Sequence, residues 1–194
     1  MHRVIQFCIG LLTTLACAAS ERGAPPVQLY DLQETIGAAH VAFQVNTLAD
    51  GRLVVATVGG PIFFDGVRWQ VVNHPRMLGG FNAMALSADG RVYSAFNGDI
   101  GYWHEPVRGK WEWQSLAERL PPEDRATDVN RGVLLQRERN LVWYVTQSRL
   151  IRMQADHGAT LVRHGQPLVG GWLVDDQVWV QDLELLGVVG LLDP

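Results

Sequence analysis

Short apolar runs separated by turn residues dominate residues 41–194 of the chain. The run Leu-Val-Val-Ala-Thr that follows Arg52 is apolar on both faces, which is typical of a strand in a sheet that is covered on both sides. Asp-Gly at Asp50, Gly-Gly at Gly59 and a second Asp-Gly at Asp65 are hairpin-turn signals. Three turns join four antiparallel strands, which we expect at about 41–48, 52–57, 61–65 and 68–73.

The segment that begins at Asp50 returns thirty-nine residues later, at Asp89. In both copies Asp-Gly-Arg is followed by a short apolar run, a glycine-containing turn and a second apolar run. The second run ends in Phe-Phe at 63–64 and in Tyr-Trp at 102–103. Four strands in about 40 residues is the period of a propeller blade. The pattern therefore predicts an all-β fold of the β-propeller class.

We expect about three and a half to four blades, each a four-stranded antiparallel sheet. Closed propellers have about four to eight blades, and an open stack leaves a bare apolar face. The sequence therefore predicts the N-terminal part of a larger propeller, or a ring that closes by association. Residues 21–40 are predicted to be a linker, with Val27–Leu32 as a possible ring-closing strand and a loop from Glu34 to His40. The expected blades span about 41–73, 81–116, 132–163 and 167–194.

Residues 1–20 combine a weakly basic start, an apolar run and small residues around Ala16-Cys17-Ala18. The run is short for a membrane span, which needs about 20 apolar residues. We therefore predict a signal peptide and export to the bacterial periplasm. A lipid on Cys17 and an uncleaved anchor are the alternatives. Attachment to the inner membrane is expected only if a full-length receptor continues beyond Pro194.

Both cysteines, Cys8 and Cys17, lie in this leader, so a mature chain has no thiol. This excludes zinc fingers, cysteine nucleophiles and iron–sulfur clusters. Removing residues 1–20 lowers Lys+Arg from 16 to 15 against 20 acids, which gives a net charge of −5. Such a charge offers no electrostatic reason to bind nucleic acid or an anionic membrane.

The pattern D-G-R-L-V-V-A-T-x-G-G-x-x-x-F-D-G-x-x-W resembles the two-component regulator propeller repeat over about residues 41–194. Blade one departs from the family pattern at Pro61, where leucine is usual, and blade three lacks its Asp-Gly, so the position of a ligand stays open. The matching residues of blade one are Asp50, Gly51, Thr57, Gly60, Phe64, Asp65, Gly66 and Trp69, and those of blade two are Asp89, Gly90, Gly98 and Trp103.

The resemblance implies a periplasmic ligand-sensing propeller of a bacterial signalling receptor. In that family a three-Tyr domain, a transmembrane helix and a histidine kinase or diguanylate cyclase usually follow, and residues 1–194 contain none of these. The implied partners are a small-molecule or glycan ligand, the remaining blades and a membrane-linked signalling domain. The alternatives are a secreted propeller enzyme, such as a lyase or glycan hydrolase, and a protein-interaction scaffold.

Three sets of residues have a chemical and a structural interpretation. His104-Glu105 could form an acid–base pair, although a turn after the third strand of blade two accounts for it. Asp175-Asp176 could bind calcium, although it stands where other blades have Asp-Gly and so predicts a hairpin turn. Trp111 and Trp113 could form an aromatic platform for a sugar or peptide, or pack in the outer strand. We predict no metal site.

Propellers usually bind ligands where the inner strands meet the central channel, so residues that start the inner strands are the default site. We predict no catalytic residues and no cofactor, since Gly59-Gly60 and Gly79-Gly80 lack the spacing of a phosphate-binding loop. The predicted ligand-binding residues at the starts of inner strands are His40, Phe81, Asn82, Asn130 and Arg131. Asn97 and Asp99, in the turn of blade two, are predicted to reach the same rim.

Overall fold

The computed structural model describes residues 28–36, 41–73, 83–96, 98–125, 130–137, 139–154, 159–163, 167–183 and 189–190. The chain divides into two compact units, Met1–Asp31 and Leu32–Pro194. The first unit is described only at residues 28–31, which form neither helix nor strand. The predicted signal peptide lies outside the described residues. No described helix is long and apolar enough to cross a membrane.

The second unit is built almost entirely from antiparallel sheets, which confirms the predicted all-β fold. Within each sheet the spatial order of the strands follows the order of the chain, as in a meander. Blade one consists of β1 (Ala42–Thr47), β2 (Leu53–Thr57), β3 (Gly60–Phe64) and β4 (Trp69–Val71). Blade two consists of β5 (Met84–Leu86), β6 (Val92–Phe96), β7 (Asp99–Val107) and β8 (Lys110–Ser115).

The two remaining sheets repeat this plan. Blade three consists of β9 (Asn130–Gln136), β10 (Leu141–Thr146), β11 (Arg149–Gln154) and β12 (Ala159–Arg163). Blade four has three described strands, β13 (Leu168–Val174), β14 (Gln177–Asp182) and β15 (Val189–Gly190). The turn between β13 and β14 is Asp175-Asp176, with φ of +50° and +58°. Both residues therefore adopt the left-handed conformation that a tight hairpin requires, as the turn interpretation predicts.

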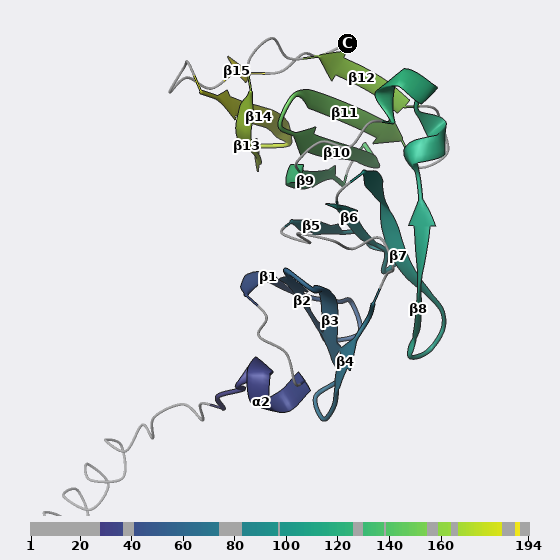
Figure 1. Ribbon diagram of the computed structural model, residues 1–194, viewed down its shortest axis with the longest axis vertical. Helices are drawn as coiled ribbons and strands as arrows, with labels where there is room; N and C mark the ends of the chain where they lie inside the picture. The colour runs from purple at the N-terminus through teal and green to yellow at the C-terminus, as the bar shows by residue number, and fades with distance from the viewer. Residues whose placement is uncertain are drawn as a thin grey trace, which may run out of the picture. The chain divides into compact units, whose positions relative to one another are not determined.

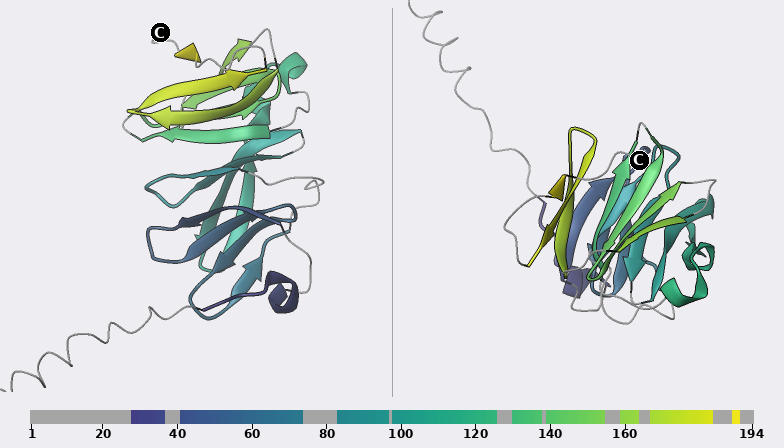
Figure 2. Two further views of the ribbon diagram at one scale, coloured as in Figure 1. Left: turned by 90° about the vertical axis from the view of Figure 1, so that its left-hand side faces the viewer. Right: turned by 90° about the horizontal axis from the view of Figure 1, so that it is seen from above.

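The four blades stack face to face in chain order, with their first strands in a row (Figures 1 and 2). Strand β9 contacts both β5 and β13. Strands β1 and β5 are joined by Gln44, whose Nε2 donates to the Met84 carbonyl at 3.1 Å and whose Oε1 accepts from the Met84 N–H at 3.0 Å. The first strand of each blade is therefore its inner strand.

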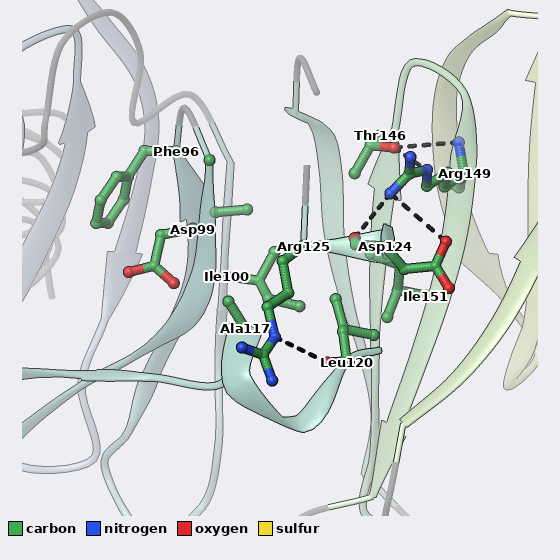
Figure 3. Close-up of a pocket in the computed structure, with 12 residues that line it drawn as sticks. Phe96, Asp99, Ile100, Ala117, Leu120, Asp124, Arg125, Thr146, Arg149 and Ile151 are labelled. Carbon is green, nitrogen blue, oxygen red and sulfur yellow. Dashed lines mark hydrogen bonds and ion pairs between the residues drawn. The ribbon is translucent and has the colours of Figure 1, made fainter. Parts of the chain in front are cut away.

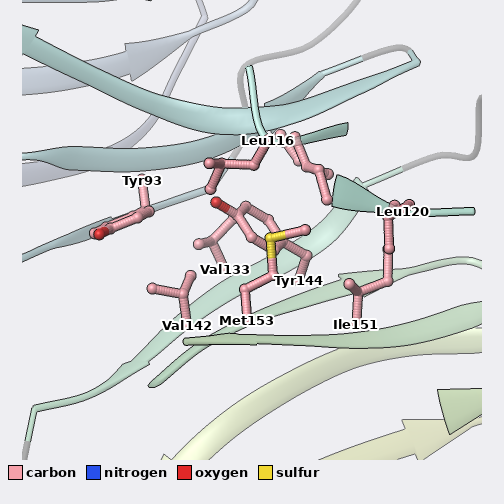
Figure 4. Packing of buried hydrophobic residues seen from close by; sticks show 10 residues of the cluster. Tyr93, Leu116, Leu120, Val133, Val142, Tyr144, Ile151 and Met153 are labelled. Atoms are coloured by element: carbon pink, nitrogen blue, oxygen red, sulfur yellow. The ribbon is translucent and has the colours of Figure 1, made fainter. Parts of the chain in front are cut away.

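The apolar core lies between the blades. Val54 and Phe63 of blade one pack with Val92 and Trp103 of blade two, and none of these four is more than 2% exposed. A second cluster joins blades two and three (Figure 4), and a third joins blades three and four. Because each middle blade has a neighbour on both sides, its second strand is buried on both faces.

Tyr144 of β10 is fully buried, and its hydroxyl donates to the Gly101 carbonyl of β7 at 2.9 Å. Burial raises the pKa of Tyr144. Tyr144→Phe removes this hydrogen bond, so we expect a loss of about 1 kcal/mol in the free energy of unfolding. Urea denaturation measures it. Tyr102→Phe, which changes a half-buried tyrosine of β7, is the control and is expected to change stability by less than about 0.5 kcal/mol. Equal effects would contradict the role of this bond.

The predicted ring-closing strand at Val27–Leu32 is wrong where the structure describes it. Residues 28–31 are not a strand, and Leu32 begins helix α2 (Leu32–Ile36), which also replaces the start of the loop expected from Glu34. Asp31 stands before this helix with Glu34 three residues later, which is a helix-start pattern and places an acid in the first turn. α2 contacts β4 of blade one.

The segment between blades two and three contains two short 3₁₀ turns, η1 (Ala117–Arg119) and η2 (Pro122–Asp124). Leu116 and Leu120, each 4% exposed, pack from this segment into the cluster between the two blades (Figure 4). The segment therefore fills space between neighbouring sheets.

Candidate functional site: the cleft between the Asp-Gly-Arg turns

A cleft with a volume of about 490 Å³ lies between the β1–β2 turn and the β5–β6 turn. This volume is in the range of small-molecule sites, about 300–1,000 Å³. Three acids, two arginines, one histidine and one tryptophan lie in its wall. The lining residues are Leu48, Ala49, Asp50, Arg52, Ala88, Asp89, Gly90, Arg91, His104, Glu105 and Trp111.

Both turns owe their shape to the repeated Asp-Gly-Arg sequence. Gly51 and Gly90 have φ of +86° and +85°, a conformation that side chains rarely adopt. The N–H of Gly51 donates to the Leu48 carbonyl at 3.0 Å, and the N–H of Gly90 donates to the Ser87 carbonyl at 3.1 Å. The two turns are therefore closed by equivalent bonds, and the arginine that follows each glycine reaches the same cleft.

Arg52 links blade one to blade two. Its Nη1 donates to Glu105 Oε1 at 2.8 Å, Nη2 donates to the other Glu105 oxygen, and Nε donates to Asp50 Oδ2 at 2.7 Å. The side chains of Arg52 and Glu105 are 12% and 13% exposed. The hydrogen bonds from Arg52 hold the pKa of Glu105 below its usual range, and those to Glu105 raise the pKa of Arg52.

Arg91 occupies the equivalent place in blade two and has different partners. Its Nε lies 3.1 Å from Asp89 Oδ2, and its guanidinium carbon lies 4.9 Å from the centre of the Tyr102 ring. A hydrogen bond with Tyr93 raises the pKa of Arg91. The Asp89 side chain is 55% exposed, so it can accept hydrogen bonds from a molecule in the cleft.

His104 does not end the third strand of blade two, as the sequence suggested, because β7 continues to Val107. The ladder between β7 and β8 shifts register between His104 and Val107, and Pro106 falls in this irregular stretch. Proline has no N–H to donate, so it suits such a position. The turn then closes at Gly109, with φ of +79°. His104 and Glu105 therefore both lie on a strand in the wall of the cleft.

The two tryptophans of β8 are used in packing. Trp111 stacks on Phe63 of blade one, with ring centres 3.9 Å apart, and lies 5.5 Å from the guanidinium carbon of Arg52. Trp113 packs against Phe96 and Trp103. This arrangement favours the packing interpretation over a free aromatic platform.

Of the residues predicted at the channel mouth, the structure describes Asp99, Asn130 and Arg131. Asp99 is 7% exposed and accepts from Trp113 Nε1 at 3.0 Å and from the Ser115 hydroxyl at 2.5 Å. Asn130 is 5% exposed, and its Nδ2 donates to the Ala95 carbonyl of blade two at 3.2 Å. Arg131 is exposed on β9. His40, Phe81, Asn82 and Asn97 lie outside the described residues.

Asp99 lines a small cavity between blades two and three, together with residues of η1 and η2 (Figure 3). In the same place Arg149 Nη1 donates to the Asp124 carbonyl at 2.7 Å, and Arg125 Nε donates to the Leu120 carbonyl at 2.9 Å. The cavity volume is about 30 Å³, which is room for about one water molecule. Asn130 thus links blade three to blade two, Asp99 joins β7 to β8 within blade two, and ligand binding at the channel mouth stays a prediction.

Sequence reasoning treated Arg52 and Arg91 only as residues after a turn. A signal was present, because arginine follows Asp-Gly in both of the first two blades, before Leu53 and before Val92. What the sequence did not show is that neighbouring blades bring the two arginines to one cleft.

No family model and no curated protein matches the chain. Several solved structures do align with the chain. Virginiamycin B lyase from Staphylococcus aureus aligns with a TM-score of 0.58 and 13% identity, over 73% of this chain and 48% of the lyase. The extracellular domain of a putative hybrid two component system from B. thetaiotaomicron aligns with a TM-score of 0.56 and 18% identity, over 74% of this chain and 19% of that chain.

The neighbours are β-propellers. The described residues therefore form part of a β-propeller. A second structure of the B. thetaiotaomicron domain, described as part of a putative one component system, gives a TM-score of 0.57 and 18% identity and covers 75% of this chain. This chain spans 48% of the lyase and 20% of that domain's chain. At identities of 13% and 18%, the similarity to these structures shows a shared fold and nothing further.

Proposed function

We propose that the chain is the ligand-sensing propeller of an exported bacterial signalling receptor, with a small polar molecule bound in the cleft between the Asp-Gly-Arg turns. The cleft is the observation that carries this proposal, because its volume and its mixed charged wall suit a small molecule. The likeness to the extracellular domain of a putative two component system supports the sensing role and the export. The resemblance of the repeat to two-component regulator propellers agrees with it.

The charges of the cleft are largely paired with one another. Glu105 and Asp50 both accept from Arg52, and Asp50 also lies 3.4 Å from Arg108. A ligand with one strong charge therefore finds little unpaired opposite charge there. Half-exposed carboxylate oxygens such as those of Asp89 suit hydrogen bonds with hydroxyl or amide groups.

A panel of sugars, amino acids and short peptides, titrated while tryptophan fluorescence is recorded, tests the proposal. We expect at least one class to change the emission saturably, since Trp111 lies in the cleft wall. His104→Ala removes a hydrogen-bonding group, and Asp89→Asn replaces a carboxylate acceptor with an amide donor, so each should raise the dissociation constant of that ligand by about tenfold. The control is Arg131→Ala on exposed β9, which should leave binding unchanged.

Two outcomes count against this assignment. If Arg131→Ala weakens binding while the two cleft variants do not, the ligand lies at the channel mouth. If no compound of the panel binds to the folded protein, the sensing proposal loses its basis in the cleft.

An enzyme is the second candidate, because one structural neighbour is virginiamycin B lyase and His104 lies beside Glu105 in the cleft. Both oxygens of Glu105 are bound by Arg52, and its lowered pKa keeps it ionised near neutral pH. An ionised carboxylate cannot donate a proton, and the hydrogen bonds from Arg52 to both oxygens weaken it as a base, so Glu105 is poorly suited to acid–base catalysis. Incubation with virginiamycin B, followed by chromatography, is expected to show no conversion.

A further inference from the structure

We propose that the cleft between the Asp-Gly-Arg turns extends to blade three, and that its ligand is a short peptide whose C-terminal carboxylate is bound by Arg137. This inference rests on the proposed function and names the chemical class of the ligand. It starts from a second depression, with a volume of about 170 Å³, beside the cleft. Both are lined by Leu48, Ala49, Ala88 and Gly90. The cleft and this inner depression therefore form one groove.

The groove runs from the outer strand of blade two toward the inner strands of three blades. Trp111 of the outer strand β8 lines the cleft, whereas Thr47 and Leu86, the last residues of β1 and β5, line the inner depression. Arg137 follows the end of β9 and lines the same depression, because β9 lies against β5. A groove that crosses three neighbouring blades suits an elongated molecule better than a compact one.

The chemistry of the wall changes along the groove. In the cleft, charged groups are largely paired with one another, as Arg52 is with Glu105. Where the cleft meets the inner depression, the side chains of Leu48, Ala49 and Ala88 are apolar. An aliphatic side chain can lie against this stretch, whereas the hydroxyl groups of a sugar find few hydrogen-bonding side chains there.

Arg137 supplies a positive charge at the far end of the groove. Its backbone carbonyl accepts from the Asn140 N–H at 3.3 Å and so helps to close the turn. Its side chain is exposed, and among the residues that the structure describes none forms a hydrogen bond or ion pair with its guanidinium. Arg139 of the same turn instead lies 3.7 Å from Asp176 of blade four. Arg137 therefore keeps its donors for a carboxylate, which it can bind through two parallel hydrogen bonds.

A short peptide presents its groups in the order that the groove requires. Its carboxylate meets Arg137, an aliphatic side chain meets the apolar stretch, and its backbone N–H groups meet Asp89, which is 55% exposed. A sugar fits less well for a second reason. The Trp111 ring on which it would stack already contacts Phe63 and Arg52. The charge of the ligand thus falls beyond the cleft, whose own charges are paired.

Calorimetric titration with tripeptides of alanine and leucine, each as the free acid and as the C-terminal amide, tests the proposal. We expect the natural chain to bind the acid about fivefold more tightly than the amide, which is the effect of one exposed ion pair. Arg137→Gln should abolish this preference and leave the affinity for the amide unchanged. Arg139→Gln is the matched control and should keep the preference, because it removes the same charge from the same turn at a residue outside the groove lining.

The outcomes separate this inference from the proposed function. If the natural chain binds acid and amide equally, or if both arginine variants lose the preference, Arg137 does not bind the carboxylate and the inference fails, while the cleft remains a ligand site. If sugars bind and tripeptides do not, the ligand is not a peptide and the inference fails alone. If neither class binds, the proposed function fails with it. Both arginine side chains are exposed, so the variants should melt at the temperature of the natural chain.

Discussion

Replacing Gly101 with alanine is expected to lower the free energy of unfolding by about 3 kcal/mol or more. A Cβ at this position would lie 2.2 Å from the Gln114 carbonyl oxygen and 2.8 Å from a ring carbon of Trp113. The first obstacle is the backbone of β8, which is paired with β7 and cannot move alone. The Gly101 carbonyl also accepts from Tyr144, so a shift of β7 disturbs the contact with blade three.

Urea denaturation followed by tryptophan fluorescence measures this loss. Gly66→Ala is the control, because Gly66 has φ of +96° and no atom within 4 Å of an added Cβ. It carries only the conformational cost, about 1–2 kcal/mol. If Gly101→Ala is no more destabilising than Gly66→Ala, the close approach of β7 and β8 does not limit the residue at this position.

Removing the Arg52 side chain in Arg52→Met should destabilise the protein by about 2 kcal/mol near neutral pH. The variant leaves Glu105, 13% exposed, without the guanidinium that binds both of its oxygens. The double variant Arg52→Met/Glu105→Gln removes the unpaired charge and should recover about half of the loss. Arg68→Met, on a residue near the exposed Asp65-Gly66 turn, is the control. If the single and double variants are equally unstable, the charge of Glu105 is not the cause.

The effect of Arg52 should depend on pH in a defined direction. The folded-state pKa of Glu105 lies below the ordinary value of 4.5, so the stabilisation is fully present above that value. It is lost as the pH falls through the folded-state pKa and the carboxylate is protonated. The difference between the natural chain and Arg52→Met should therefore shrink over the interval below pH 4.5, as the pH falls. A stability difference that stays constant over this interval would contradict the predicted direction of the pH dependence.

The strands and turns could be predicted because their signals are local. The turn at Asp50-Gly51 needs a positive φ that glycine supplies, and the same two residue types at Asp89-Gly90 mark the next blade. α2 was missed because Val27–Leu32 is apolar enough to suggest a strand, although Asp31 and Glu34 carry a helix-start pattern. Local pattern alone did not decide between the two.

The cleft could not be predicted in the same way. Arg52 and Glu105 are fifty-three residues apart, and they meet only because blade two stacks on blade one. Asp99 was predicted at a ligand site from its place in a turn, but the contacts that bury it come from Trp113 and Ser115 of β8. Distances set by stacking depend on blade twist and spacing, which a repeat pattern does not specify.

Among the residues that the structure describes, no blade has an apolar cluster of its own, because each of the three clusters is shared by two sheets. The blades therefore behave as a row of units held by nearest-neighbour coupling. Within the described clusters, blades two and three each take part in two couplings, whereas blades one and four each take part in one. Local opening then begins at the ends of the row and reaches the middle last. A substitution in one blade therefore also changes the packing of the neighbouring blades. Blades with one coupling lose structure before blades with two.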